Sequence, residues 1–179
     1  MIRVAKLTTD KIFIVGPMGS GKTTIGRILA EILDFKFFDL DFEIEKRSGA
    51  NIPWIFDVEG EEGFRQRESR VLEELSSLTN TVLATGGGAV ILKKNREILK
   101  KHGFTIYLRA PIDKLVERTS HDQNRPLLKV SNPRKAIEKM VTDRESLYKD
   151  VANFVYITDK QRPRLVADEI AYEVRKFIV

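Results

Sequence analysis

The chain has 179 residues, of which 42% are hydrophobic and 32% are charged, and its formal net charge is +5. This length fits one domain over residues 1–179, and the basic residues are spread among acidic ones, which argues against nucleic-acid binding. The absence of cysteine excludes disulfides, and the sequence contains neither a signal-peptide pattern nor an apolar stretch long enough to span a membrane. We therefore expect a cytoplasmic protein with a site for anions.

The first expected strand and helix flank a phosphate-binding loop. Residues 12–15 are typical of a buried strand, and residues 24–33 have apolar side chains at helical spacing. Between them, residues 16–23 read Gly-Pro-Met-Gly-Ser-Gly-Lys-Thr and match G-x-x-x-x-G-K-[ST]. Lys22 would reach the β- and γ-phosphates, and the Thr23 hydroxyl would ligate Mg²⁺. The motif predicts a nucleoside triphosphate site, with contacts from Gly19, Ser20, Gly21, Lys22, Thr23 and Thr24.

A second strand over residues 35–38 ends in two carboxylates, Asp39 and Asp41. If the strand period of two continues, both side chains point to the same face, into the crevice that holds the phosphate loop. Carboxylates there can hold Mg²⁺ and accept the proton of an attacking hydroxyl. The alternative is that Asp41 caps the helix that follows.

The third expected strand, residues 81–84, leads into three consecutive glycines, Gly86, Gly87 and Gly88. Three glycines carry a large backbone entropy cost, so a simple turn would rarely need all of them. They fit a place where the backbone approaches a ligand closely. A flexible connection to the next helix is the alternative.

Two more strands, residues 104–108 and 154–157, complete the pattern, with helical segments between the strands. This alternation predicts an α/β fold with three layers, in which helices cover both faces of a five-stranded parallel sheet. Ligands in such folds bind beyond the carboxyl ends of the strands. The polar stretch at residues 120–132 has the length of a lid, and we place the lid at about residues 118–132.

Two arginines fall within apolar helical stripes. Arg144 lies in the stripe of a helix expected over residues 133–149, and Arg65 lies in the stripe of a helix expected to begin near Glu61. Inward guanidinium groups suit bidentate capture of a carboxylate. For Arg65 the alternative is an i,i+4 ion pair with Glu61.

Arg118 and Arg125 border the polar stretch and are suited to covering triphosphate charge when a lid closes. The alternative for both is an ordinary solvated arginine.

Taken together, these residues resemble the shikimate kinases, members of the nucleoside monophosphate kinase-like group of phosphate-loop proteins. The resemblance runs from the phosphate loop nearly to the C-terminus. The segments that carry it are residues 16–24, Asp39-Leu40-Asp41, residues 59–65, residues 86–90, Arg125-Pro126-Leu127-Leu128, and Arg144 with Leu147-Tyr148.

The resemblance implies transfer of the ATP γ-phosphoryl group to the 3-hydroxyl of shikimate, in the route to chorismate and the aromatic amino acids. It assigns catalysis to Lys22, Asp39, Asp41 and Arg125. Thr23 and Asp39 would hold Mg²⁺, Asp39 through water. Asp41 would bind the shikimate hydroxyls and is the better candidate for accepting the proton.

The same resemblance assigns the shikimate carboxylate to Arg65 and Arg144, with a backbone contact from the glycine run at Gly87. Arg125 would move in with the lid to stabilise the transferring group. Arg118 and Gln161 would lie on the adenine side.

Other functions are weighed against this one. A gluconate kinase-like sugar-acid kinase shares the expected fold and the paired acids, and an ATP-binding module without catalysis is a further alternative. A nucleoside monophosphate kinase fits less well, because nothing indicates a second base pocket, and a GTPase lacks an N-K-x-D segment. No spare apolar stripe is present, so we expect a monomer.

Overall fold

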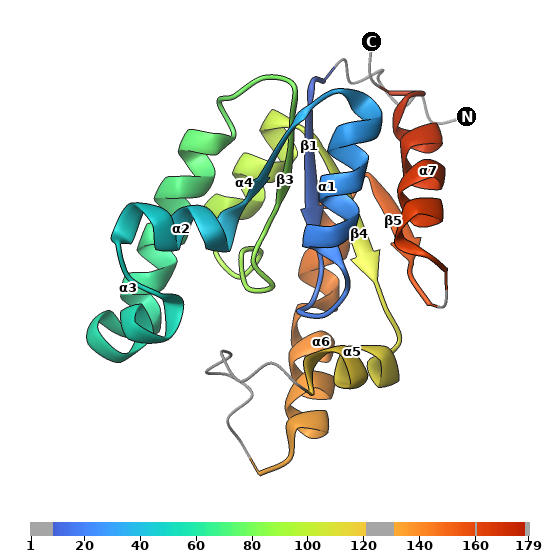
Figure 1. The fold of residues 1–179 in the computed structure, drawn as a ribbon. Helices are drawn as coiled ribbons and strands as arrows, with labels where there is room; N and C mark the ends of the chain where they lie inside the picture. The colour runs from blue at the N-terminus through green and yellow to red at the C-terminus, as the bar shows by residue number, and fades with distance from the viewer. Residues whose placement is uncertain (1–8, 121–130, 160, 178–179) are drawn as a thin grey trace.

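The computed structural model describes residues 9–120, 131–159 and 161–177. Within this part of the chain, five parallel strands form one sheet in the order β2-β3-β1-β4-β5 (Figure 1). The strands are β1 (Lys11–Val15), β2 (Lys36–Asp39), β3 (Thr81–Ala84), β4 (Phe104–Arg109) and β5 (Phe154–Ile157). The five strands expected from the sequence are thus confirmed, with shifts of one residue at some ends.

Helices cover both faces of the sheet (Figure 1). On one face lie α1 (Lys22–Leu33) and α7 (Pro163–Val174); on the other lie α2 (Leu40–Ser48), α3 (Ile52–Leu75), α4 (Lys93–His102) and α6 (Pro133–Val151). A further helix, α5 (Ile112–Thr119), follows β4 and packs against α6. The predicted three-layer α/β/α fold is confirmed.

The alternation of side chains along β1 explains the two layers of core. Ile12 and Ile14 pack in the cluster with α1 and α7, whereas Phe13 and Val15 pack in the cluster with α2, α3, α4 and α6. Successive side chains of a strand point to opposite faces, so one buried strand contributes to both cores. All four of these side chains are fully buried.

The helix α3 differs from the prediction, which had it begin near Glu61. It begins at Ile52, where the Asn51 side chain accepts a hydrogen bond from the Trp54 amide at 2.9 Å. Gly60 has φ 70° and ψ −179°, outside the helical region, so α3 is kinked there. The prediction therefore located only the segment after the kink.

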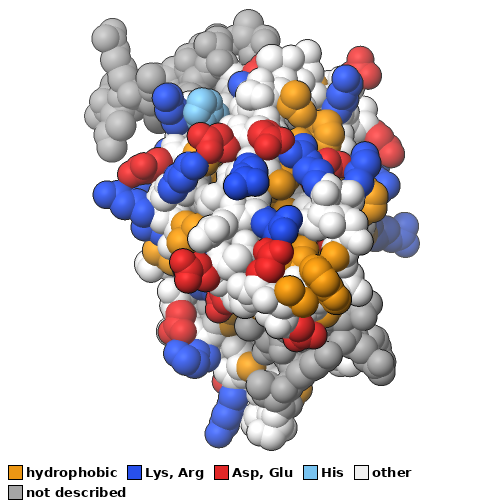
Figure 2. Space-filling model, turned by 90° about the vertical axis from the view of Figure 1, so that its left-hand side faces the viewer, with side chains coloured by type: hydrophobic (Ala, Val, Ile, Leu, Met, Phe, Trp, Pro, Cys, Tyr) orange, Lys and Arg blue, Asp and Glu red, His pale blue; other side chains and the backbone are white. Residues whose placement is uncertain are grey.

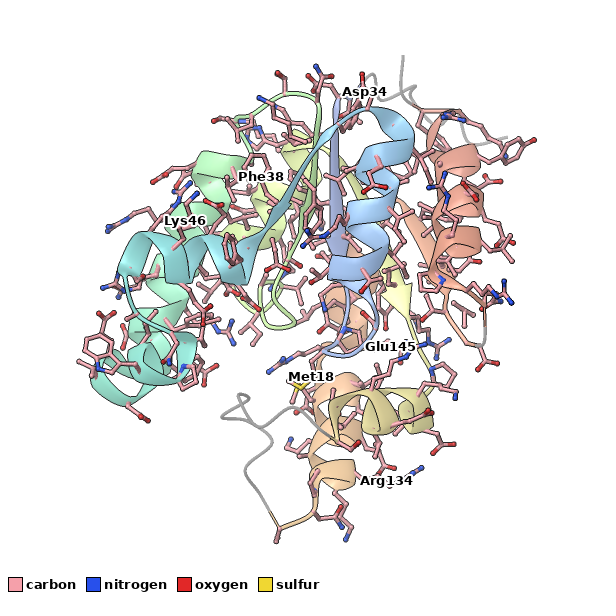
Figure 3. All side chains as sticks on the ribbon, in the orientation of Figure 1. Met18, Asp34, Phe38, Lys46, Arg134 and Glu145 are labelled. Carbon is pink, nitrogen blue, oxygen red and sulfur yellow. The ribbon has the colours of Figure 1, made fainter. Side chains whose placement is uncertain are left out.

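The strand order determines where a ligand can bind. β1 is the central strand, with β3 on one side and β4 on the other. The chain moves outward from β1 to β2 and later crosses back over β1 to reach β4, so the order reverses at β1. Figure 3 shows Met18 of the phosphate loop at the carboxyl end of the sheet. Ligands of open α/β sheets bind at this kind of position.

The surface carries both signs of charge. On the face drawn in Figure 2, Lys and Arg side chains are interspersed with Asp and Glu side chains. Ion pairs of the described residues include Lys94 with Glu73 and Arg67 with Glu59. In the described ranges, the helices are too short or too polar to cross a membrane.

Candidate active site

The phosphate loop between β1 and α1 has the backbone geometry of an anion site. Gly21 has φ 96° and is the N-cap residue of α1, a conformation that glycine adopts without strain. In the described chain no side chain caps this helix end, and the first turn contains no acidic residue. The first amides of α1 therefore combine hydrogen-bonding capacity with partial positive charge, which suits a phosphate group.

Two side chains of the loop are largely enclosed. Lys22 is 9% exposed, and its Nζ donates a hydrogen bond to the Pro17 carbonyl at 2.8 Å. The Ser20 side chain is fully buried, and its hydroxyl has no hydrogen-bond partner among the described residues. The Lys22 ammonium is thus held at the loop, whereas the Ser20 side chain is enclosed within it.

Thr23 and Asp39 meet although they are 16 positions apart. The Thr23 hydroxyl donates a hydrogen bond to Asp39 Oδ2 at 2.6 Å, and Asp39 Oδ1 accepts one from the Phe42 amide at 3.2 Å. A hydroxyl and a carboxylate form the oxygen donor set that Mg²⁺ accepts together with phosphate oxygens. The two residues predicted to hold the metal therefore fit it in chemistry and in position.

The predicted relation between Asp39 and Asp41 needs a correction. The strand ends at Asp39 and α2 begins at Leu40, so the strand period of two does not continue to Asp41. It is Asp39 that caps α2, through the Phe42 amide, and not Asp41 as the alternative supposed. Both carboxylates nevertheless line the same cavity, because the chain turns into α2 at the carboxyl end of the sheet.

A cavity of about 210 Å³ lies at this end of the sheet. Its lining residues come from the phosphate loop and α1, from the end of β2 and the start of α2, and from the segment after β3. They are Met18, Gly19, Gly21, Lys22, Thr23, Thr24, Asp39, Asp41, Thr85 and Gly87. Met18 and Thr85 were not predicted; each lies within or next to a predicted motif, which is the only signal that the sequence offers for them.

Arg65 is buried on α3 between two carboxylates. It is 7% exposed, Nη1 contacts Glu68 Oε2 at 2.7 Å, and Nη2 contacts Glu61 Oε1 at 3.3 Å. The i,i+4 pair with Glu61, the alternative to carboxylate capture, is present, and the inward placement of Arg65 is confirmed. Sequence reasoning missed Glu68, although a carboxylate three residues after Arg65 on an apolar helical face is a visible signal.

Glu68 has an unusual electrostatic environment. Its side chain is fully buried, and Oε1 has no hydrogen-bond partner among the described residues. Burial raises the pKa of Glu68 to about 7; Arg65 opposes this shift, and the negative charge of Asp41 adds to it. The charges of Asp41, Arg65 and Glu68 therefore influence one another across the site.

The glycine run after β3 is a place of close approach. A Cβ at Gly86 would lie 2.7 Å from Asp41 Oδ1 and 3.1 Å from Glu68 Oε1. A Cβ at Gly88 would collide with the guanidinium group of Arg65. These contacts explain the glycines at both positions better than a flexible connection does.

Arg144 on α6 reaches the same run of glycines. Its Nη1 donates to the Gly87 carbonyl at 3.4 Å, and the Tyr148 hydroxyl donates to the same oxygen. Gly87 lines the cavity together with both aspartates, so α6 brings the Arg144 guanidinium group next to a lining residue, although neither Arg144 nor Arg65 itself lines the cavity. Arg144 also affects the electrostatic environment of Glu68, which agrees with this placement.

Arg118 of α5 contacts the phosphate loop and the segment after β5. Its Nη1 donates to the Gly19 carbonyl at 3.1 Å, and its Nη2 donates to the Asp159 carbonyl at 3.3 Å. The Gln161 side chain accepts a hydrogen bond from the Asp159 amide at 3.1 Å. Arg118 thus joins the loop to the segment after β5, and Gln161 lies in that segment. Arg125 and most of the predicted lid fall outside the described residues.

Comparisons with known proteins identify the family. The profile of the family described as shikimate kinase matches residues 18–175. The shikimate kinase of Nitrosococcus oceani is 51% identical over 166 residues, covering 93% of this chain and 87% of that protein. The shikimate kinase of Chromohalobacter salexigens is 50% identical over 165 residues, covering 92% of each chain. The solved structure of shikimate kinase from Acinetobacter baumannii in complex with shikimate has a TM-score of 0.92 and 47% identity, covering 96% of each chain. The chain therefore belongs to the shikimate kinase family of ATP-utilising phosphotransferases.

Proposed function

We propose that this protein transfers the γ-phosphoryl group of ATP to the 3-hydroxyl of shikimate, giving shikimate 3-phosphate and ADP. The observation that carries the proposal is a single cavity lined both by the phosphate loop and by Asp41 and Gly87. Phosphoryl transfer requires donor and acceptor oxygens to be in line, so both substrates must bind in one cleft. Membership of the family agrees with this activity.

The phosphate loop and α1 are assigned to the nucleotide. The amides of Gly19 and Gly21 and the start of α1 would cradle the phosphates, and the Lys22 ammonium would turn from the Pro17 carbonyl to phosphate oxygens. Thr23 and Asp39 would hold Mg²⁺, which supplies positive charge to the phosphate oxygens when it is bound. Thr24 lines the same part of the cavity.

Asp41 is assigned to the acceptor. The oxygen of the shikimate hydroxyl forms a bond to the γ-phosphorus while the bond to the bridging oxygen of ADP breaks. The released proton passes to the Asp41 carboxylate, which lies next to Gly86 and lines the cavity. Lys22 would offset the charge on the leaving group.

Arg65 and Arg144 are assigned to the carboxylate of shikimate. Both lie at the glycine run, and charge-assisted hydrogen bonds from guanidinium groups suit a planar carboxylate. Glu68 holds one side of Arg65 and leaves the guanidinium anchored within a buried environment. A neutral sugar would offer these two guanidinium groups no carboxylate to bind.

Arg118 and Gln161 are assigned to the adenine side of the nucleotide, where the segment after β5 meets the phosphate loop. Arg125 keeps its predicted role in stabilising the transferring group. The monomeric state and the cytoplasmic location likewise stay predictions.

An assay of ADP release tests the proposal. The purified protein should release ADP in the presence of ATP, Mg²⁺ and shikimate, and mass spectrometry should detect shikimate 3-phosphate. Gluconate in place of shikimate should give only the background rate. Turnover of gluconate would favour the sugar-acid kinase alternative, and ATP binding without any turnover would favour the non-catalytic module.

A further inference from the structure

Two buried tyrosines stack beside the acceptor site. Tyr107 of β4 and Tyr148 of α6 are both fully buried, and their ring centroids are 5.0 Å apart with an interplanar angle of 24°. Their hydroxyl groups differ. The Tyr148 hydroxyl donates to the Gly87 carbonyl, whereas the Tyr107 hydroxyl has no hydrogen-bond partner among the described residues.

Among the described residues, no backbone amide donates a hydrogen bond to the Gly87 carbonyl, unlike the carbonyls of Gly86 and Gly88. The Gly86 carbonyl accepts from the Ala89 amide at 3.2 Å, and the Gly88 carbonyl accepts from the Ile91 amide at 3.0 Å. In the described chain, the donors to the Gly87 carbonyl are side chains of α6, Tyr148 and Arg144. Because the run contains three glycines, its backbone has wide freedom and needs such external restraints.

The orientation of this carbonyl has a consequence for the neighbouring amide. The peptide group is planar, so the Gly87 carbonyl and the Gly88 amide point in opposite directions. A donor that holds the carbonyl towards α6 therefore turns the amide away from α6. Burial raises the pKa of Tyr148, so its hydroxyl stays protonated and remains a donor throughout the physiological range.

Tyr148 also lies one helical turn after Arg144, and both side chains meet the same oxygen. The Arg144 contact is long, at 3.4 Å, and Arg144 is assigned to the substrate. When the guanidinium group engages a carboxylate, the Tyr148 hydroxyl is the donor that remains on Gly87. Arg144 would thus bind the substrate, while Tyr148 holds the Gly87 carbonyl.

We propose that the Tyr148 hydroxyl is a positioning group for the acceptor site: it fixes the Gly87–Gly88 peptide in the orientation that shikimate requires. This inference rests on the proposed function. It assigns no chemical step to Tyr148.

The test compares Tyr148→Phe with Tyr107→Phe. Each variant removes one buried hydroxyl from the same stacked pair and keeps both rings, but only Tyr148→Phe removes a hydrogen bond. We expect Tyr148→Phe to raise the KM for shikimate about three- to tenfold, the size of one lost hydrogen bond, with the KM for ATP unchanged. Tyr107→Phe should leave both constants at the wild-type values, and the double variant should match Tyr148→Phe.

Each other outcome overturns the inference. An unchanged KM for shikimate in Tyr148→Phe would refute it, as would an equal rise in the KM for ATP. Equal losses in both single variants would attribute the effect to packing of the rings, and unfolding of Tyr148→Phe at the assay temperature would assign the hydroxyl a purely structural role. Wild-type protein that does not turn over shikimate would overturn the proposed function and this inference together. An active wild type with an unaltered Tyr148→Phe variant overturns the inference alone.

Discussion

The two sides of the cavity are built in different ways. The phosphate-binding part of the nucleotide side, residues 16–24, is one continuous segment from the end of β1 into α1. The acceptor side consists of Asp41 from α2, Arg65 from α3, the glycine run after β3, and Arg144 from α6. The nucleotide side offers mainly backbone amides, which local residues can orient, whereas the acceptor side offers buried and half-buried charges that four segments must hold in place.

This difference has a consequence for substitutions. On the nucleotide side, a changed side chain should reduce turnover with little effect on stability, because the loop backbone is held by its glycines and by β1. On the acceptor side, charges are buried against one another, so a change there should alter substrate binding and stability together. The following predictions test that contrast.

The largest effect is expected from Lys22→Ala. Loss of the ammonium removes charge stabilisation from the transferring phosphoryl group, so kcat should fall on the order of 10³-fold. The midpoint of thermal unfolding should shift little, because the loop backbone is held by its glycines and by β1. ADP release and thermal unfolding measure the two quantities. If Lys22→Ala lost as much stability as the acceptor-side variants, the two sides of the cavity would not differ in their contribution to stability.

Arg144→Ala should weaken shikimate binding by about 2–5 kcal/mol, because a partly desolvated charged contact is lost. The KM for ATP should stay the same. Arg134→Ala is the matched control on α6, since Arg134 is half exposed and pairs with Asp113 and Glu138 at the surface. A change in the KM for ATP alone would show that α6 serves the nucleotide side instead.

Thr23→Ala should raise the Mg²⁺ concentration needed for half-maximal activity by at least about tenfold, the effect of losing even an outer-shell metal partner. Thr23→Ser retains the hydroxyl that faces Asp39 and should restore most of the activity. A titration of activity with Mg²⁺ gives both values. Equal Mg²⁺ requirements in the wild type and Thr23→Ala would remove Thr23 from the metal site.

The smallest effect concerns stability and pH at Glu68. Its pKa is raised from 4.5 to about 7 in the folded state, so between these values the folded chain keeps a proton that the unfolded chain has released. The stability of the wild type should therefore fall as the pH rises through this window. Gln at position 68 cannot ionise. The free energy of unfolding of Glu68→Gln, minus that of the wild type, should therefore increase from pH 5 to pH 8.

Urea unfolding at several pH values measures this difference. Glu73→Gln is the control, because Glu73 is on the same helix but forms an exposed pair with Lys94. Lys94 lowers the pKa of Glu73, so the free energy of unfolding of Glu73→Gln relative to the wild type should not change over the same pH range. If the relative free energy of unfolding of Glu68→Gln also stayed constant with pH, burial would not suppress ionisation of Glu68.

Local patterns were sufficient for the sheet and for the phosphate loop. Buried strands appear as short apolar runs, and the loop motif encodes its backbone conformation in the order of its own residues, as at Gly21. The burial of Arg65 and the contact of Arg144 with Gly87 also agree with the sequence, since a cation inside an apolar helical stripe must meet something inward. These features depend on neighbours within a few positions, which a single sequence displays.

Other features were decided only by the packing of distant segments. The kink at Gly60 hid the first part of α3, because helical periodicity is interrupted there. Asp39 and Asp41 share the cavity through the turn into α2 and not through the strand period. The burial of Glu68 against Arg65, and the contact from Tyr148 to Gly87 across 61 positions, exist only once α3, α6 and the glycine run meet. A sequence records the residue types, but the desolvation and hydrogen bonding that give them their chemistry arise from contacts among segments far apart in the chain.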